Sequence, residues 1–413
     1  MTEVISLKEY QRYGDISEND LIKINKFLQK NKLDFAFKIT PHTIETSSWI
    51  GVLKHKNIQL EVLPKLLSSS KYDNKLTLSN LLFMLSYTHN LNIKTTNMAS
   101  QNKSTNPFLE ILIREYAVSL LEGLKKQTPK SYIRNEDNLH FVKGKLNINQ
   151  QIRYNISNGT KFFCEYDEFS EDNILNQLFN YVSKCLYNIS EDNYNKKILG
   201  LIRNYYSDIS DVSISLAKAL KITLFRNQKI FEKPLSLAKM FLEHSSIDMS
   251  QNKIQNIALL WDMNQLFEEF VFEVIARKSI IKNINVTYQK GRKLLRNGTL
   301  KQRNTFVDIF IERGKEKEKI VVDTKYKLLE DLNSVSNADV FQVSTYCLLH
   351  DANKAVLIYP QWNEKINISH CFLNTSDSAK QYAINFKTIN LQKDLREYLY
   401  EVEAELFDAI DFM

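Results

Sequence analysis

The chain has 413 residues, of which 43% are hydrophobic and 25% are charged. This length exceeds what one hydrophobic core needs, so we expect two or three packed domains, and the apolar content excludes an intrinsically disordered protein. The formal net charge of +7 is compatible with a polyanionic partner, but the basic residues are spread along the sequence and do not establish one.

The cysteines, histidines and apolar runs exclude several classes of protein. The four cysteines show no C-x-x-C spacing and the seven histidines form no H-x-x-H pair, so we expect neither a zinc site nor a disulfide framework. No apolar run approaches the roughly 20 residues of a membrane span, and the amino terminus lacks the basic and apolar regions of a signal peptide. We therefore expect a soluble cytoplasmic protein.

Short strands precede helices in the first part of the chain. Residues 34–66 contain "FAFKI", "WIGVLKH" and "IQLEVLPKL", which are rich in β-branched and aromatic residues and nearly alternate. Apolar residues then recur at spacings of three and four in residues 76–91 and 106–126, which predicts helices. A second sheet element is expected at 139–148. We assign residues 1–160 to a small N-terminal β-unit plus helices.

The middle of the chain is predicted to be helical. The run "SEDNILNQLFNYVSKCLYNI" starts at Ser170, a candidate N-cap, and carries acids where the first turn would lie, so it predicts a long helix. Helical patterns continue to about Ser250, which gives a helical region over residues 161–250.

The last region, residues 251–413, combines strands and helices. We expect a helix from about Ile257 to Lys278, a hairpin, a helix near Ala338 to Leu349, the buried strand "KAVLIYP" and a terminal amphipathic helix. Strands that alternate with helices indicate an α/β or α+β domain.

The hairpin carries the residues with the clearest chemistry. Two apolar strands over 305–312 and 320–327 are joined by the short connection "RGKEKEK". Symmetric pairing sets Asp308 nearly opposite Asp323. Because side chains alternate along a strand, Lys325 should point to the same side as Asp323.

Two carboxylates and an ammonium on one surface predict a cation site. By the same alternation, Thr324 should point to the other face. Neighbouring carboxylates repel and lose hydration in an apolar strand, so a cation between them would stabilise the arrangement. Mg²⁺ suits this set, with Mn²⁺ as a substitute, and it serves phosphodiester hydrolysis, in which a lysine orients the attacking water or takes its proton. The alternative is a cross-strand salt bridge between Asp308 and Lys325.

A carboxylate in the preceding helix favours the metal site. In "LWDMNQLFEEFVFEVI", Glu268 lies beside the apolar face, because apolar residues follow it at i+3, i+4 and i+7. Glu269 is the alternative, although its neighbour Glu273 indicates a solvated face.

Two polar residues of the helix after the hairpin are further candidates. Gln342 and Tyr346 are four residues apart and share one stripe of the helix. They would hold a catalytic residue or a DNA phosphate, or they form the polar rim of an ordinary helix.

The order of these residues resembles a known family. A helical Glu, a strand Asp, D-x-K and then Q-x-x-x-Y resemble the PD-(D/E)XK nuclease core. The segments "LFEEFVFEVI", "VDIFI", "IVVDTKYK", "NADVFQVSTY" and "VLIYP" resemble more closely the McrC family, the nuclease subunits of McrBC-type restriction systems. The resemblance covers roughly residues 130–362, and the first 125 residues match only loosely.

The resemblance implies a fold class and roles for single residues. The fold would be α+β and multidomain, with a C-terminal PD-(D/E)XK-type α/β nuclease domain. Asp308 and Asp323 would be metal ligands with Glu268 as an additional ligand, Lys325 would be the catalytic lysine, and Gln342 an auxiliary residue. The chain departs from the superfamily pattern in having Phe306 and Val307 before Asp308, where the pattern has proline.

A basic stretch precedes the first candidate ligand. Residues 284–307 contain no acid, and a basic loop at the mouth of a metal site would hold a DNA backbone. The alternative is a solvated loop. The six cations are Lys290, Arg292, Lys293, Arg296, Lys301 and Arg303.

The sequence also implies a partner. No nucleotide-binding G-x-x-x-x-G-K-[ST] loop is present, so the chain should not hydrolyse nucleotide itself. In the McrC family that task belongs to McrB, an AAA+ GTPase, and the resemblance implies contact through residues 1–160. The leading hypothesis is a Mg²⁺-dependent DNA endonuclease subunit whose partner's GTPase it stimulates. The alternatives are a non-catalytic regulator of such a ring and a stand-alone DNA repair nuclease.

Overall fold

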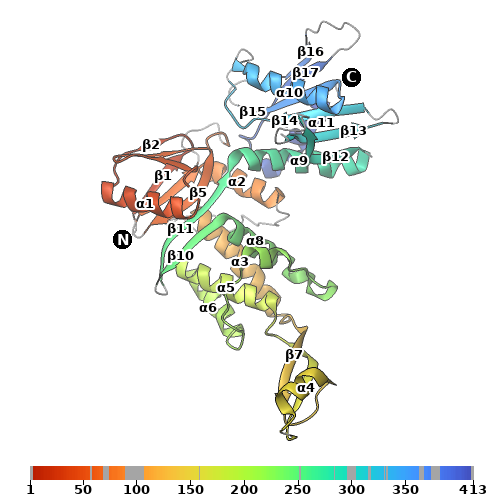
Figure 1. Ribbon diagram of the computed structural model, residues 1–413. Coiled ribbons are helices and arrows are strands. Elements are labelled where there is room, and N and C mark those ends of the chain that lie inside the picture. Colours follow the sequence, from red (N-terminus) through yellow and green to blue (C-terminus); the bar gives the residue numbers. More distant parts are fainter. Residues whose placement is uncertain are drawn as a thin grey trace, which may run out of the picture. The chain divides into compact units, whose positions relative to one another are not determined.

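The chain folds into two compact units (Figure 1). The first comprises residues 1–95 and 255–413, and the second comprises the inserted residues 96–254. The predicted regions 1–160, 161–250 and 251–413 follow other limits, and as functional divisions they stay predictions. The computed structural model describes residues 3–55, 58–67, 74–88, 107–157, 159–250, 253–282, 284–294, 304–314, 318–329, 331, 334–361, 367–373 and 382–410. Within these ranges, none of the helices is both long and apolar enough to cross a membrane.

The N-terminal part of the first unit is a small α/β layer, and the predicted strands in residues 34–66 are confirmed. In this unit the larger sheet has the order β1-β6-β5-β11, with β1 parallel to β6 and the other pairs antiparallel, and β2-β4-β3 form a second sheet. Helix α1 packs its apolar side on the larger sheet. The elements are β1 (Glu3–Lys8), β2 (Arg12–Tyr13), α1 (Glu18–Lys30), β3 (Phe37–Ile39), β4 (Ile44–Thr46), β5 (Trp49–His55), β6 (Ile58–Leu63) and β11 (Lys253–Asp262).

Strand β11 corrects the expectation of a helix from Ile257. Residues up to Asp262 pair with β5, and the helix α9 (Met263–Lys282) begins only after them. The apolar run "IALLW" fits a strand or a helix, and its distant partner β5 decides between them. Gly51 makes the pairing close: its φ is +128°, and a Cβ there would lie 2.0 Å from the Leu259 carbonyl oxygen.

The C-terminal part of the first unit is a mixed sheet of order β12-β13-β14-β15-β17-β16. The first three strands are antiparallel, β14, β15 and β17 run parallel, and β16 is antiparallel to β17. Helix α10 covers one face, while α9 and α11 contact each other on the opposite side (Figure 1). The elements are α2 (Asn74–Thr88), β12 (Asn285–Lys293), β13 (Asn304–Arg313), β14 (Glu318–Thr324), α10 (Asn337–His350), β15 (Lys354–Pro360), β16 (Asn367–Phe372), β17 (Ala383–Ile389) and α11 (Leu395–Ile410).

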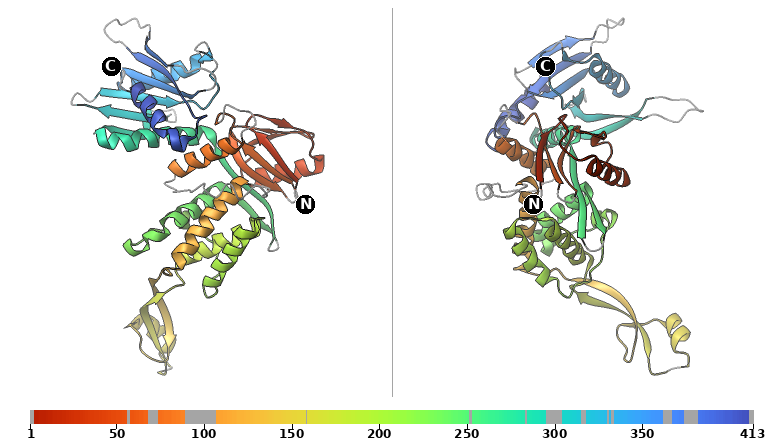
Figure 2. Two further views of the ribbon diagram at one scale, coloured as in Figure 1. Left: turned by 180° about the vertical axis from the view of Figure 1, so that it is seen from behind. Right: turned by 90° about the vertical axis from the view of Figure 1, so that its left-hand side faces the viewer.

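The second unit combines a helical bundle with a small sheet of order β7-β9-β8 (Figure 2). The predicted helices over 106–126 and 170–189 are confirmed, whereas of the sheet element predicted at 139–148 only the two residues of β8 and the end of β7 form strands. The elements are α3 (Pro107–Leu124), β7 (Ser131–Leu139), β8 (Lys145–Leu146), α4 (Ile148–Asn155), β9 (Phe162–Ser170), α5 (Ile174–Ile189), α6 (Asn193–Tyr205), α7 (Leu216–Leu220), the 3₁₀ helix η2 (Arg226–Phe231), α8 (Glu232–His244) and β10 (Ser245–Ser250).

Two details of the helical prediction were wrong. Ser170 ends β9, and the N-cap of α5 is Asn173, whose side chain accepts hydrogen bonds from the backbone of Leu175 and Asn176 at 3.1 Å. The side-chain amide of Asn173 also donates to the carbonyl of Pro129 at 2.9 Å, so a distant contact fixes the start of the helix. Helices also stop before Ser250, because β10 occupies the last six residues of that region.

Candidate active site

Strands β13 and β14 place Asp308 next to Asp323. Their last paired residues are Ile309 and Val322, so the next positions along the ladder are the two aspartates, as the symmetric hairpin predicted. Beyond that pair, a side chain takes the place of the backbone hydrogen bonds between the two strands. The Asp308 Oδ2 accepts hydrogen bonds from the Thr324 backbone N–H at 2.8 Å and from the Thr324 hydroxyl at 3.0 Å. The prediction that Thr324 faces away was therefore wrong, because β14 ends there and strict alternation ends with it.

Asp323 is a buried carboxylate with few polar groups to offset its loss of hydration. Its side chain is 0% exposed, and the Lys325 Nζ lies 2.5 Å from its Oδ2. Apart from that ion pair, neither carboxylate oxygen has a hydrogen-bond partner among the described residues. Burial, followed by the charge of Asp308, raises the pKa of Asp323 to about 7, although Lys325 acts in the opposite direction. A carboxylate in this state is costly unless another group satisfies it.

Lys325 remains a cation in this environment. Burial alone would lower its pKa, but the carboxylates of Asp323 and Asp308 raise it, and the net pKa lies above the ordinary value of a lysine. The ammonium is therefore suited to stabilising negative charge.

Glu268 approaches Asp308 from helix α9. Burial, followed by the charge of Asp308, raises the pKa of Glu268 to about 7. The Gln289 Nε2 donates to the Glu268 Oε1 at 3.2 Å. The alternative residue, Glu269, accepts instead from Gln265 at the exposed side of the helix, at 2.8 Å. Asp308 is thus the common neighbour whose charge raises the pKa of both other acids.

The acids do not form a closed metal cage. Throughout the described part of the chain, no group of three or more His, Cys, Asp or Glu side chains is arranged to hold one ion between them. Asp308 and Asp323 adjoin each other, and Glu268 is a neighbour of Asp308.

A second charged cluster at the start of α10 was missed from the sequence. The Lys327 Nζ lies 2.5 Å from the Asp339 Oδ2, and the buried Tyr359 hydroxyl donates to the same oxygen at 2.9 Å. Burial would raise the pKa of Asp339, but the hydrogen bonds from Lys327 and Tyr359 prevail and lower it. The signal was present, because Lys327 follows Lys325 by two residues and Asp339 lies in the same stretch as Gln342.

Gln342 and Tyr346 form a pair on their own helix. The Gln342 Nε2 donates to the Tyr346 hydroxyl at 2.7 Å, so the two residues share one stripe as predicted. Tyr346 is the hydrogen-bond partner of Gln342 among the described residues. An auxiliary role for Gln342 at the acids stays a prediction.

The basic stretch is partly a strand and not a loop. Lys290, Arg292 and Lys293 lie in β12, because this segment pairs with β13, whereas Arg296, Lys301 and Arg303 lie outside the described residues. The Lys290 Nζ is 3.7 Å above the Phe310 ring and 3.6 Å from the Glu312 Oε2, so it is already engaged.

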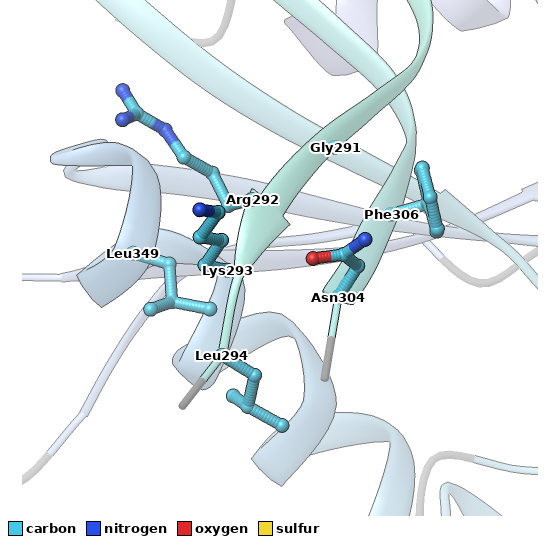
Figure 3. A pocket seen from close by; sticks show the side chains of 7 residues that line it. All are labelled: Gly291, Arg292, Lys293, Leu294, Asn304, Phe306 and Leu349. Carbon is cyan, nitrogen blue, oxygen red and sulfur yellow. The ribbon is translucent and has the colours of Figure 1, made fainter. Parts of the chain in front are cut away.

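The end of β12 borders an open hollow of about 800 Å³ (Figure 3). None of the acidic site residues lines it, so the hollow is distinct from the carboxylate site. The lining combines basic, apolar and amide side chains, and in Figure 3 the basic Arg292 and the apolar Phe306 point in different directions. It is therefore not a single basic surface. The lining residues are Gly291, Arg292, Lys293, Leu294, Asn304, Phe306 and Leu349.

Comparison with known proteins gives the family. Two solved structures from Thermococcus gammatolerans are similar. One is a chain of a half-complex from a tetradecameric assembly of McrB AAA+ hexamers with bound McrC, with 20% identity over 97% of this chain and 100% of that chain and a TM-score of 0.67. The other belongs to the McrBC complex, with 23% identity over 67% and 88% of the two chains and a TM-score of 0.52.

These two likenesses show the fold, which is α+β and multidomain. No curated protein matches the chain. Residues 44–360, well over half of the chain, match the family model of the "McrBC 5-methylcytosine restriction system component". The chain therefore belongs to the family of McrBC 5-methylcytosine restriction system components.

Proposed function

We propose that this chain is the Mg²⁺-dependent DNA endonuclease subunit of a McrBC-type restriction system, with a PD-(D/E)XK-type catalytic site. The observation that carries the proposal is the state of Asp323, a fully buried carboxylate that adjoins Asp308, pairs with Lys325 and accepts no other hydrogen bond from the described residues. A folded protein retains such a group at a cost, and functional sites are where that cost recurs.

The donor set fits a hard divalent cation. Mg²⁺ is usually bound by one or two carboxylates and completes its shell with waters and substrate phosphate oxygens, so it does not need a cage of three acids. Asp308 and Asp323 would hold the ion, Glu268 would be an additional ligand, and Mn²⁺ would substitute. When bound, the ion would supply positive charge to a phosphodiester and make a nearby water more acidic.

The other site residues would orient the metal ligands and stabilise the charge that develops on the substrate. Lys325, a cation beside Asp323, would offset the negative charge that develops on the scissile phosphate. Thr324 fixes the orientation of Asp308 through two hydrogen bonds to one oxygen. Gln342 would act as the auxiliary residue.

Double-stranded DNA would be the substrate. Arg292 and Lys293 of β12 are exposed close to the start of β13, and with Lys290 and the three cations Arg296, Lys301 and Arg303 they would neutralise backbone phosphates. Because such contacts do not read bases, the choice of modified site would belong to the partner.

The partner would be a McrB-like AAA+ GTPase whose hydrolysis this chain stimulates. Support comes from the similar structure, which is described as McrB AAA+ hexamers with bound McrC. Within residues 1–160, the segment from β7 to the end of α4 and the residue after it carries large apolar side chains that are 55–79% exposed, and gathered apolar exposure marks contact surfaces. These side chains are Tyr132, Phe141, Val142, Ile148, Ile152, Tyr154 and Ile156.

A cleavage assay with the full chain tests the proposal. The protein, a McrB-type AAA+ partner, GTP, Mg²⁺ and a 5-methylcytosine-containing plasmid should yield cut DNA, and EDTA or Asp323→Ala should prevent cleavage while partner binding persists on gel filtration. Cutting by Asp323→Ala would remove the assignment. GTPase stimulation without any cutting would identify a regulator, and cutting without the partner would identify a stand-alone nuclease.

A further inference from the structure

Gln289 has an unusual backbone conformation for a residue inside a strand. Its φ is +46°, in the left-handed region that residues other than glycine seldom adopt. The other described non-glycine residues with positive φ, Tyr10, Lys32 and Asp351, all lie in turns or at a helix end. Gln289 lies in β12, so turn geometry does not account for it.

The conformation changes where the neighbouring side chains point. In a regular strand, consecutive side chains point to opposite faces. Here both Tyr288 and Gln289 reach helix α9: the ring centroid of Tyr288 is 4.9 Å from that of Phe272, and the Gln289 Nε2 is 3.2 Å from the Glu268 Oε1. The left-handed backbone therefore brings two adjacent residues to one helix.

No inserted residue explains the irregularity. Tyr288 pairs with Ile309 and Lys290 pairs with Val307, so the register is the same on both sides of Gln289. That register puts Gln289 directly across from Asp308. The strained residue thus contacts Glu268 and lies across from Asp308, and strain of this kind persists where surrounding contacts enforce it, often at functional sites.

We propose that Gln289 is a positioning residue that holds the Glu268 carboxylate beside Asp308, an inference that rests on the proposed nuclease function. Glu268 is a partly exposed side chain on a helix, where a long side chain has more than one allowed rotamer. The amide donor at 3.2 Å favours the rotamer that faces β12, and the Tyr288 hydroxyl is a second polar group beside the same carboxylate. Gln289 would act on the metal site only through Glu268, as outer-shell partners do.

Three variants of the full chain separate this role from a structural one. Gln289→Gly removes both the amide and the backbone strain, because glycine adopts positive φ freely. Gln289→Asn keeps an amide that is one methylene shorter, on a residue that tolerates this conformation. Asp351→Gly is the matched control: it relieves a φ of 55° at the end of α10, where the Asp351 side chain is 94% exposed.

The readouts are thermal unfolding without metal, Mn²⁺ affinity by electron paramagnetic resonance, and cleavage rate with the partner. Both glycine variants should melt at or up to about 2–4 °C above the parent. Gln289→Gly should lose about 10–100-fold in Mn²⁺ affinity and cleavage rate, Gln289→Asn should lose less, and Asp351→Gly should lose neither.

Two results would overturn the inference. One is a Gln289→Gly protein that binds Mn²⁺ and cuts DNA as Asp351→Gly does. The other is a loss that occurs only together with a lower melting temperature, which would indicate a structural role alone. Failure of the proposed function looks different, because the parent protein itself would then bind no Mn²⁺ and cut no DNA.

Discussion

Two buried carboxylates, one in each unit, have opposite surroundings. Glu110 of α3, in the helical unit, is 3% exposed and accepts hydrogen bonds from the Ser190 hydroxyl at 2.7 Å, the Glu191 backbone at 2.6 Å and the Asn195 amide at 2.7 Å. Asp323 of β14 is 0% exposed, and its one polar partner among the described residues is Lys325.

The difference separates a structural group from the carboxylate that we assign to the proposed metal site. The acceptor sites of Glu110 are used by the turn between α5 and α6, so this carboxylate ties that turn to α3 and has little capacity left for a ligand. Asp323 keeps its lone pairs, and a cation can use them. Equal burial therefore has different consequences at the two positions, and substitutions at each can test them.

Replacing Asp323 should cost function and not stability. Asp323→Asn should reduce metal-dependent cleavage by more than about 100-fold, beyond what residues that merely support a ligand cost. It should leave the metal-free protein at least as stable, because the raised pKa of Asp323 indicates that the folded protein favours a neutral group at this position, even with Lys325 beside it. Cleavage rate and thermal unfolding measure the two effects. A variant that unfolds earlier but still cuts would reverse the comparison.

Replacing Lys325 should also lower cleavage strongly. Lys325→Gln removes the cation beside Asp323 and should reduce the cleavage rate by about 10²–10³-fold, as loss of one charge-stabilising donor does. Lys327→Gln is the control, because Lys327 is a lysine two residues away whose partner is Asp339. Equal losses in the two variants would speak for the general charge of the segment and against a specific role of Lys325.

Replacing Glu110 should cost stability and not function. Glu110→Ala leaves buried donors of Ser190 and Asn195 without their acceptor, at about 1–3 kcal/mol for each donor. Denaturant unfolding should therefore show a lower free energy of unfolding. Cleavage by the fraction that remains folded should keep its Mg²⁺ dependence, and a changed Mg²⁺ requirement would contradict a purely structural role.

Glu9 is an intermediate case that predicts a pH effect. Its Oε2 accepts from the Lys65 backbone at 2.8 Å and from the Tyr326 hydroxyl at 3.2 Å, while its Oε1 accepts nothing among the described residues. Burial, the dominant cause, raises the pKa of Glu9 from 4.5 to about 8. The folded protein thus holds this proton more tightly than the unfolded chain does.

The direction of the pH effect follows from this difference in proton affinity between the folded and the unfolded state. The contribution of protonated Glu9 to stability is fully present below pH 4.5 and is lost as the pH rises to about 8. Glu9→Gln stays neutral, so its melting temperature should fall less than that of the parent across this window. If the melting temperatures of the two proteins fell equally with rising pH, Glu9 would be ionised in the folded state across this window.

Local patterns predicted the hairpin and the neighbourhood of its acids. Alternation and a short connection were enough to set Asp308 against Asp323, because both signals lie within about twenty residues. Helical spacing likewise located Glu268 beside the apolar face. These features depend on residues close in sequence, so local sequence patterns are enough to predict them.

The features that were missed depend on distant partners. Residues 257–262 became a strand because β5 pairs with them, and Asn173 became the N-cap while Pro129 anchors it. The left-handed backbone of Gln289, whose side chain contacts α9, leaves no mark in the amino-acid pattern. Tertiary contacts decided each of these cases over local propensity.

The pairing of β11 with β5 has a practical consequence for dissecting the protein. A fragment that starts near residue 251 would contain β11 without β5, the strand it pairs with in the intact chain. An uncovered strand edge of this kind recruits other chains. Fragments for biochemical work should therefore keep the first 63 residues, which supply that sheet through β6.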